Sequence, residues 1–483
     1  MTAIPVRRLP QRLRRDAGLT IARFFWPGSP QRAASVIGLV ACLDPETVSR
    51  MLTSCLDDFG ERYDDLPGIF EDHHAEAAER VGATDSFSAE QRKLIGAYFT
   101  MEYAYASAAF FNPSIVPAQD QRDVPAGSVR FVMSLRAVGE GHVSSLVFRE
   151  GLIDADGGIT IDPVPPQSRR LRVFEDRTFM KRRFRLKLIE AGAYTDLADV
   201  VLDRLGEAFA LSDLERALEN VRQTLDDEAK LAGTDDAMRW LAHSNYQVKA
   251  PEDAALSQLV LFPLSENESN GLEDMRLVTF TDDDGARIYG TYTAYNGSRV
   301  LPQLMEIKGQ RTAEVHTLSG RYAVNKGMAL FPRRLDGRYA AITRHDGRNL
   351  YLATSDNIRF WNEAELIQEP RYPWEFVQIG NCGSPLETDA GWLLLTHGVG
   401  PMRRYCIGAS LLDRDDPTRV IGQTAEPLLL PLPEESGGYV PNVVYTCGAM
   451  VHNGTLVIPY GISDVETGFA AVALPELLAG LGA

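Results

Sequence analysis

Cysteine is scarce in this sequence, basic residues are outnumbered by acidic ones, and no long apolar run occurs. The five cysteines are odd in number and scattered, and no pair has metal-site spacing: Cys42, Cys55, Cys382, Cys406 and Cys447. We therefore expect reduced thiols, a cytoplasmic protein and no metal. No apolar run reaches the roughly 18 residues that a membrane-spanning helix needs. The basic N-terminus, MTAIPVRRLPQRLRRDAG, lacks the apolar stretch of a secretory signal, so we interpret it as a solvated arm.

The charge balance is strongly acidic. The formal net charge is −17 at pH 7, which argues against a protein that binds nucleic acid by neutralising its phosphates. A local basic pocket for a small anion is compatible with this balance. The 483 residues can bury a large core, and their length suggests about two or three domains. We expect neither nucleic acid nor a membrane as a partner, and we leave homo-oligomer formation open.

Helical patterns occupy two parts of the chain. In LDPETVSRMLTSCLDDFGERY, apolar residues recur at a helical period, and Ser88 with Gln91 has the spacing of a capping box. We expect an N-terminal helical region over residues 1–104. A second block has the mixed charge of solvated helical faces, which predicts a helical insertion over residues 168–245.

The remaining segments have the pattern of short strands separated by Gly, Asp and Asn turns. Examples are SVRFVMSLRAV, LVTF–DDDG–ARIYGTYTAY and GWLLLTHGV. Strands that recur at short spacing are typical of a sandwich, a barrel or a propeller. We expect residues 105–167 and 246–483 to form one mainly β domain, which the helical insertion interrupts and a short C-terminal helix ends.

Polar and charged residues gather at the expected strand ends, most densely in the run LEDMR. This run places Glu273 and Asp274 beside Arg276. A carboxylic acid that donates a proton needs burial and nearby charges to tune its pKa. The alternative interpretation, that these are solvated turn residues, has about even weight on spacing alone. Further candidates of the same kind are Arg136, Lys326, Arg344, His397, Arg403, Arg404, Tyr405 and Asp464.

Nine short motifs resemble, in collinear order, the signatures of glycoside hydrolase family 130, the β-mannoside phosphorylases and their hydrolytic relatives. They are FNPSIVP, SLRAVGEGHVSS, LEDMR, NKGMALFP, TRHDG, GNCGSP with GWLLLTHGVG, RRYCIGASLLDRDDP, GYVPNVVYTCG and PYGISD. Each motif is weak alone, but the shared order makes the resemblance strong. It covers about residues 105–165 and 245–473, and it implies a five-bladed β-propeller with its site on the central axis.

The resemblance also implies a role for each matching residue. Asp274 is the general acid, whose proton reaches the glycosidic oxygen through a sugar hydroxyl. A dianionic nucleophile needs fixed donors that hold it in line with the anomeric carbon, and the implied phosphate-binding set is Lys326, Arg344, His397 and Tyr405. The implied substrate-binding set is Asn112, Arg136, Glu273, Arg276 and Asp464. No metal or organic cofactor is implied, and inorganic phosphate is the co-substrate.

The function that the resemblance implies is inverting phosphorolysis of a β-mannoside, with α-mannose 1-phosphate as the product. Two alternatives stay open. A β-mannoside hydrolase on the same scaffold would need a carboxylate base, for which Asp464 and Glu140 are candidates, and Gln378 stands where phosphorylases tend to carry a basic residue. A non-catalytic sugar-binding propeller is disfavoured by the cluster of Lys, Arg and His, since neutral sugars rarely require so many cations.

Overall fold

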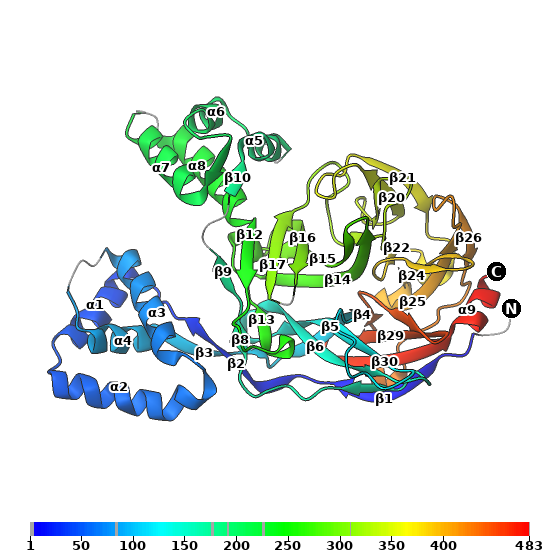
Figure 1. The fold of residues 1–483 in the computed structure, drawn as a ribbon, viewed down its shortest axis with the longest axis horizontal. Helices are drawn as coiled ribbons and strands as arrows, with labels where there is room; N and C mark the ends of the chain where they lie inside the picture. Colours follow the sequence, from blue (N-terminus) through cyan, green and yellow to red (C-terminus); the bar gives the residue numbers. More distant parts are fainter. Residues whose placement is uncertain are drawn as a thin grey trace.

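The computed structural model describes residues 4–82, 86–174, 178–190, 193–224, 228–309 and 311–482. Strands make up a large body, and two separate groups of helices project from it (Figure 1). The chain is therefore mainly β with helical additions, which confirms that part of the prediction. No helix in these ranges is both long and apolar enough to span a membrane.

The N-terminal residues form strands, so the expected solvated arm is wrong and the helical region does not begin at residue 1. Strand β1 (Arg7–Leu13) pairs antiparallel with β30 (Glu466–Ala473), and Leu9 is buried opposite Phe469. The guanidinium groups of Arg8 and Arg12 lie 3.3 and 3.6 Å from the buried carboxylate of Glu435. The partners of β1 lie more than 400 residues away in the chain, so no local pattern could predict this pairing.

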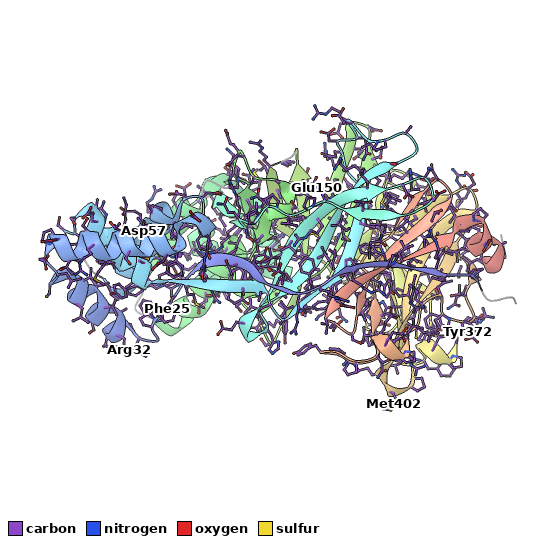
Figure 2. All side chains as sticks on the ribbon, turned by 90° about the horizontal axis from the view of Figure 1, so that it is seen from below. Phe25, Arg32, Asp57, Glu150, Tyr372 and Met402 are labelled. Carbon is purple, nitrogen blue, oxygen red and sulfur yellow. The ribbon has the colours of Figure 1, made fainter. Side chains whose placement is uncertain are left out.

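Helices α1–α4 form the first helical group. A two-stranded ribbon of β2 (Asp16–Phe24) and β3 (Thr100–Ala106) joins them to the body. Figure 2 shows β1 and β2 as one extended path that runs from the C-terminal sheet to this group. The predicted capping box of Ser88 and Gln91 is confirmed at the start of the fourth helix. The helices are α1 (Pro30–Ala41), α2 (Pro45–Phe59), α3 (Leu66–Val81) and α4 (Ala89–Tyr98).

Helices α5–α8 form the second group, together with a small hairpin. They share an apolar core that includes Phe184, Leu214 and Met238. The expected helical block nevertheless begins with two strands, β8 (Arg169–Arg170) and β9 (Arg172–Phe174), because these pair with β13 (Leu259–Leu261) and β12 (Tyr246–Lys249) of the body. The other elements are β10 (Thr178–Met180), α5 (Lys181–Glu190), α6 (Asp196–Leu202), β11 (Ala208–Ala210), α7 (Leu211–Arg222) and α8 (Glu228–His243).

The largest sheet contains two antiparallel units, and β8, β9, β12 and β13 extend them. One residue pair, Ser144 with Gly271, joins the two units in parallel. The first unit contains β4 (Ala109–Pro117), β5 (Val129–Val138), β6 (Ser144–Ile153) and β7 (Ile159–Ile161). The second contains β14 (Gly271–Asp282), β15 (Gly285–Tyr295), β16 (Val300–Lys308) and β17 (Thr312–Thr317).

Three further sheets complete the body. The four-stranded sheet contains β18 (Ala329–Leu330), β19 (Tyr339–Thr343), β20 (Leu350–Ser355) and β21 (Glu363–Gln368). The next contains β22 (Gln378–Asn381), β23 (Leu386–Thr388), β24 (Gly391–Val399), β25 (Tyr405–Leu412) and β26 (Val420–Gln423). The last contains β1, β27 (Val444–Tyr445), β28 (Met450–His452), β29 (Thr455–Ile462) and β30, and it precedes the helix α9 (Leu474–Leu481).

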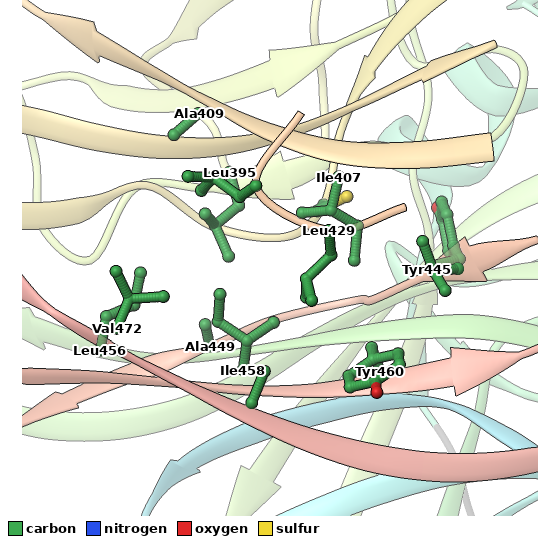
Figure 3. Packing of buried hydrophobic residues seen from close by; sticks show 14 of the residues in the cluster. Leu395, Ile407, Ala409, Leu429, Tyr445, Ala449, Leu456, Ile458, Tyr460 and Val472 are labelled. Atoms are coloured by element: carbon green, nitrogen blue, oxygen red, sulfur yellow. The ribbon is translucent and has the colours of Figure 1, made fainter. Parts of the chain in front are cut away.

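Apolar side chains fill the space between adjacent sheets. Leu395 and Ile407, from β24 and β25, belong to the same buried cluster as Ile458 of β29 (Figure 3). Tyr445 belongs to this cluster as well, and its hydroxyl contacts a buried arginine of the site described below. The packed sheets therefore hold residues from distant parts of the sequence in fixed positions beside that site.

Candidate active site

Two irregular strands bring Asn112 and Asp274 together. The pairing register of β4 shifts between Phe111 and Ser114, and that of β14 shifts between Glu273 and Arg276. Asn112 and Asp274 lie inside these shifts and have φ values of 50° and 54°. Residues other than glycine rarely adopt such positive φ values. Bulges of this kind redirect a side chain. Here Asn112 Nδ2 donates a hydrogen bond of 2.5 Å to Asp274 Oδ1.

Glu273 is held by two basic side chains. Its side chain is buried, and Arg136 Nη2 donates to Oε1 at 2.8 Å. Lys326, from the loop between β17 and β18, donates to Oε2. Both carboxylate oxygens are thus engaged, which agrees with a positioning role rather than with a second acid.

Arg276 anchors the backbone at the bulge. It is 2% exposed, and its Nη1 donates to the backbone carbonyl of Asp274 at 2.9 Å. Its Nη2 donates to the hydroxyl of Tyr445 at 2.6 Å. Because Arg276 lies on β14 and Tyr445 on β27, this bond connects the largest sheet to the last sheet at the site.

Asp274 is ionised at neutral pH in the ligand-free protein. Burial raises its pKa, but the nearby charges of Arg136, Arg276 and Lys326 and the hydrogen bond from Asn112 outweigh burial, and the pKa lies below its ordinary value. Arg136 Nη1 is 3.7 Å from Asp274 Oδ1. Without a ligand, the basic neighbours of Asp274 therefore outweigh its burial, a balance that the sequence alone left open.

Asp464 is the second unusual carboxyl group of the cluster. It lies in the turn between β29 and β30, where Ser463 and Asp464 both have positive φ. Its pKa is raised to about 6, because burial and the charges of Asp274 and Glu273 together outweigh the opposing charges of Arg136 and Arg403. Asp464 therefore titrates closer to neutral pH than an ordinary aspartate does, and it shares one basic neighbour, Arg136, with Asp274.

A second cluster surrounds His397 of β24. Arg344 Nη1 lies 3.2 Å from His397 Nε2, and because a guanidinium only donates, this ring nitrogen accepts. Burial, together with the charges of Arg344 and Arg276, holds the pKa of His397 well below its ordinary value. His397 is therefore neutral, not cationic. Its ring stacks on Tyr405 with centroids 6.0 Å apart and meets the edge of Tyr445 at 5.0 Å.

Glycine is required beside His397. Gly380 pairs with His397 across β22 and β24, and a Cβ atom added to Gly380 would lie 2.3 Å from the imidazole ring and 3.1 Å from Arg344 Nη1. Any larger residue would displace both groups.

The structure brings together most of the residues that the sequence predicts. Asn112, Arg136, Glu273, Asp274, Arg276 and Lys326 form one connected cluster, and Arg344, His397 and Tyr405 adjoin it through Tyr445. Tyr445 was not predicted, because a tyrosine in the apolar run NVVYTCG has the pattern of a core residue. Arg403 and Arg404 are both exposed, and the guanidinium of Arg403 lies 5.8 Å from the ring centroid of Tyr405.

Glu140, the other candidate base, lies exposed in the turn Glu140–His142, where its backbone carbonyl accepts a bond from Tyr103. Gln378 is half-buried at the start of β22. Within the described ranges, one group of side chains has donor atoms close enough together to hold a metal ion: Glu306, Glu314 and His316. It lies on β16 and β17, and Glu314 already pairs with Lys308 at 2.7 Å.

The sequence matches known proteins. The family model for glycoside hydrolase family 130, described as β-1,4-mannooligosaccharide phosphorylase, matches residues 248–481. A 1,2-β-oligomannan phosphorylase of Thermoanaerobacter sp. (strain X514) is 36% identical over 155 residues, which are 32% of this chain and 52% of that protein. A β-1,2-mannobiose phosphorylase of the same strain is 33% identical over 211 residues, 42% of this chain and 68% of that protein. The chain thus spans about half to two thirds of the length of these relatives.

A solved structure is also similar. The β-1,2-mannobiose phosphorylase from Listeria innocua, in complex with β-1,2-mannobiose, has a TM-score of 0.45 and 21% identity, over 78% of this chain and 92% of that one. On the sequence matches, the chain belongs to glycoside hydrolase family 130, a family of carbohydrate-active enzymes.

Proposed function

We propose that this protein is a β-mannoside phosphorylase that transfers a mannosyl group to inorganic phosphate with inversion, giving α-mannose 1-phosphate. The named relatives are phosphorylases of β-linked mannosides, and the site offers the two groups that the reaction needs. These are a carboxyl group at Asp274 and a set of fixed donors for an anion. The proposed scaffold is a five-bladed propeller. Its blades would be β4–β7, β14–β17, β18–β21, β22–β26 and β27–β30, with β1 added to the last.

The observation that carries this proposal is that the charge of Arg344 is not balanced by an acidic side chain among the described residues. Its guanidinium contacts the neutral ring of His397, and it makes no ion pair with an acidic side chain in the described part of the chain. Its Nε is buried and has no hydrogen-bond partner among these residues. Arg344 is half-buried, and a cation that is partly removed from water without a counter-ion is costly. An anion bound between Arg344 and the neighbouring donors would remove that cost.

The charge count at the site supports a dianion. The basic side chains of Arg136, Arg276, Lys326 and Arg344 outnumber the carboxylates of Glu273 and Asp274 by two. Asp464 and Arg403, which oppose each other in charge, leave this excess unchanged. Inorganic phosphate near neutral pH is a mixture of monoanion and dianion, with about one and a half negative charges on average. A neutral sugar alone would leave the excess positive charge unbalanced, which favours phosphate as the co-substrate.

The proposed reaction is a single displacement. A phosphate oxygen attacks the anomeric carbon, the bond to the glycosidic oxygen breaks, and that oxygen takes a proton from Asp274 through a sugar hydroxyl. Asp274 must therefore be protonated in the reactive complex. Bound phosphate offsets the cations that lower the pKa of Asp274 in the ligand-free site, so phosphate binding itself favours the protonated acid. Asn112 Oδ1 is buried and has no hydrogen-bond partner among the described residues, so it is free to accept a hydrogen bond from a sugar hydroxyl.

Hydrolysis is the second candidate function, and Asp464 is the observation that favours it. Its pKa of about 6 would let it act as a base toward water. A panel of β-1,2- and β-1,4-linked mannobioses, each incubated with and without phosphate, separates the two functions. Phosphorolysis requires phosphate and yields a sugar 1-phosphate, whereas hydrolysis yields free mannose in either buffer.

A further inference from the structure

A polar cleft lies between helix α8 and the loop that leads into β14. Its volume is about 780 Å³, within the range of ligand pockets. The helical group and the body each contribute to its walls. The lining residues used below are Asp236 and Trp240 from α8, with Ser265, Glu266 and Arg299 from the body.

The cleft has the chemistry of a site for a neutral, polyhydroxylated ligand. Trp240 is half-buried, and its ring offers a flat apolar surface for the C–H face of a sugar. Asp236 and Glu266 accept hydrogen bonds, and Arg299 donates them. Since acids and bases are mixed here, the cleft does not share the cationic excess of the proposed phosphate site and does not favour an anion.

An unpartnered polar atom gives independent support. Ser265 is only 9% exposed, and its Oγ has no hydrogen-bond partner among the described residues, although it lines the cleft. A buried hydroxyl without a partner is costly. The hydroxyl groups of a ligand in the cleft can supply the missing bond.

The loop beneath the cleft is firmly held and leads directly to the active-site strand. Glu268, fully buried, accepts hydrogen bonds from the hydroxyls of Tyr246 and Tyr292 at 2.7 and 2.9 Å, and from the backbone of Leu264 and Ser265. Beyond this loop, β14 begins at Gly271 and carries Glu273 and Asp274.

A second connection runs through the turn after β15. Tyr295 pairs with Gly271 and lies 5.4 Å from Lys326 Nζ, measured to its ring centroid. The turn that follows Tyr295 carries Arg299, whose backbone closes it against Asn296. One side of this turn therefore borders the catalytic cluster and the other side lines the cleft.

We propose that this cleft binds the sugar residues of an oligomannoside that lie beyond the reacting mannose, and that the helical group thereby sets a preference for longer substrates. The proposal rests on the function proposed above, since it names the substrate length that the same site accepts. Binding energy gained at a remote subsite raises kcat/KM for substrates long enough to reach it.

The test compares substrate lengths in matched variants. Trp240→Ala is expected to lower the ratio of kcat/KM for mannotetraose to that for mannobiose about tenfold. Trp240→Phe, which retains a ring, should recover most of the ratio. Arg299→Ala, on the body side, should lower it in the same direction even if Trp240→Ala folds poorly. Arg216→Ala is the control, because Arg216 is exposed on α7 and pairs within its own helix with Asp213.

The outcomes separate this proposal from the proposed function. An unchanged length ratio in Trp240→Ala and Arg299→Ala, in proteins whose thermal unfolding matches the control, would overturn the subsite. If the wild-type protein cleaves no mannoside, the proposed function fails, and calorimetric titration with mannotetraose then decides the subsite. Binding that Trp240→Ala weakens supports the cleft, and absence of binding in the wild type refutes it.

Discussion

Asn112 and Asp274 share a 2.5 Å hydrogen bond although both have positive φ and both lie where the pairing of their strands is irregular. Such backbone conformations are uncommon and cost energy outside glycine. The surrounding packing holds both residues in place, and the product is a carboxyl group aimed at basic side chains from other strands. Strain located at the centre of a charged cluster is typical of a functional site.

The first prediction concerns the proton donor. Asp274→Asn cannot deliver a proton, so its turnover of mannosides should fall by about two to four orders of magnitude, as for loss of a general acid. Asp282→Asn is the matched control and should retain activity, because Asp282 lies half-buried at the far end of the same strand, where it pairs with Arg334. The assignment of Asp274 is wrong if Asp274→Asn turns over at a near-normal rate while its circular dichroism matches that of the control.

The second prediction concerns Asn112 and the pH dependence of the rate. The hydrogen bond from Asn112 lowers the pKa of Asp274, so Asn112→Gly, which tolerates the positive φ, should raise that pKa. The protonated acid then persists to higher pH, and the alkaline limb of the kcat/KM profile should move upward. A limb that stays in place or moves to lower pH would show that Asn112 does not act through Asp274.

The same position tests backbone strain. Alanine at φ near 50° is less favourable than glycine by about 1–2 kcal/mol, so Asn112→Ala should be less stable than Asn112→Gly by about that amount. Urea unfolding of both variants measures the difference. Equal stability would mean that the backbone relaxes to a negative φ when the amide is removed.

The third prediction concerns phosphate. Arg344→Ala should raise the apparent KM for phosphate about tenfold or more, and it should raise the KM for the sugar much less, because a charge-assisted contact to the anion is lost. Arg348→Ala is the control, since Arg348 is exposed in the same loop. An equal rise in both KM values would indicate a structural role for Arg344.

The fourth prediction concerns Asp464 and stability. Its pKa is raised from 3.8 to about 6, so the folded state disfavours the charged form. The penalty is absent below pH 3.8 and grows between pH 3.8 and 6, up to about 3 kcal/mol at about 1.36 kcal/mol per pKa unit. Asp464→Asn should therefore stabilise the ligand-free protein more at pH 8 than at pH 4.5. A pH-independent gain, measured by thermal unfolding, would contradict this pKa.

Local sequence patterns predicted some features well. The capping box at Ser88 needs only residues within one helical turn, and it is present. The LEDMR run marked Glu273, Asp274 and Arg276, because dense charge at a strand end is unusual enough to notice. The propeller arrangement and the roles of these residues stay predictions.

Features that depend on distant residues could not be predicted. The strand β1 needs β30 and Glu435. The ionised state of Asp274 depends on Arg136 and Lys326, which come from another strand and a loop. The positions of these residues in the sequence do not reveal how far their charges lie from Asp274 in space. The neutral state of His397 could not be predicted either, since it follows from burial beside Arg344.

The most direct test of the account is the dependence of cleavage on phosphate. The initial rate of mannobiose cleavage is measured over a range of phosphate concentrations, with the product followed by ³¹P nuclear magnetic resonance and the free sugar by chromatography. The account predicts a rate that rises with phosphate to saturation, with α-mannose 1-phosphate formed in step with each bond cleaved. Equal rates in phosphate-free buffer, with free mannose as the product, would contradict it.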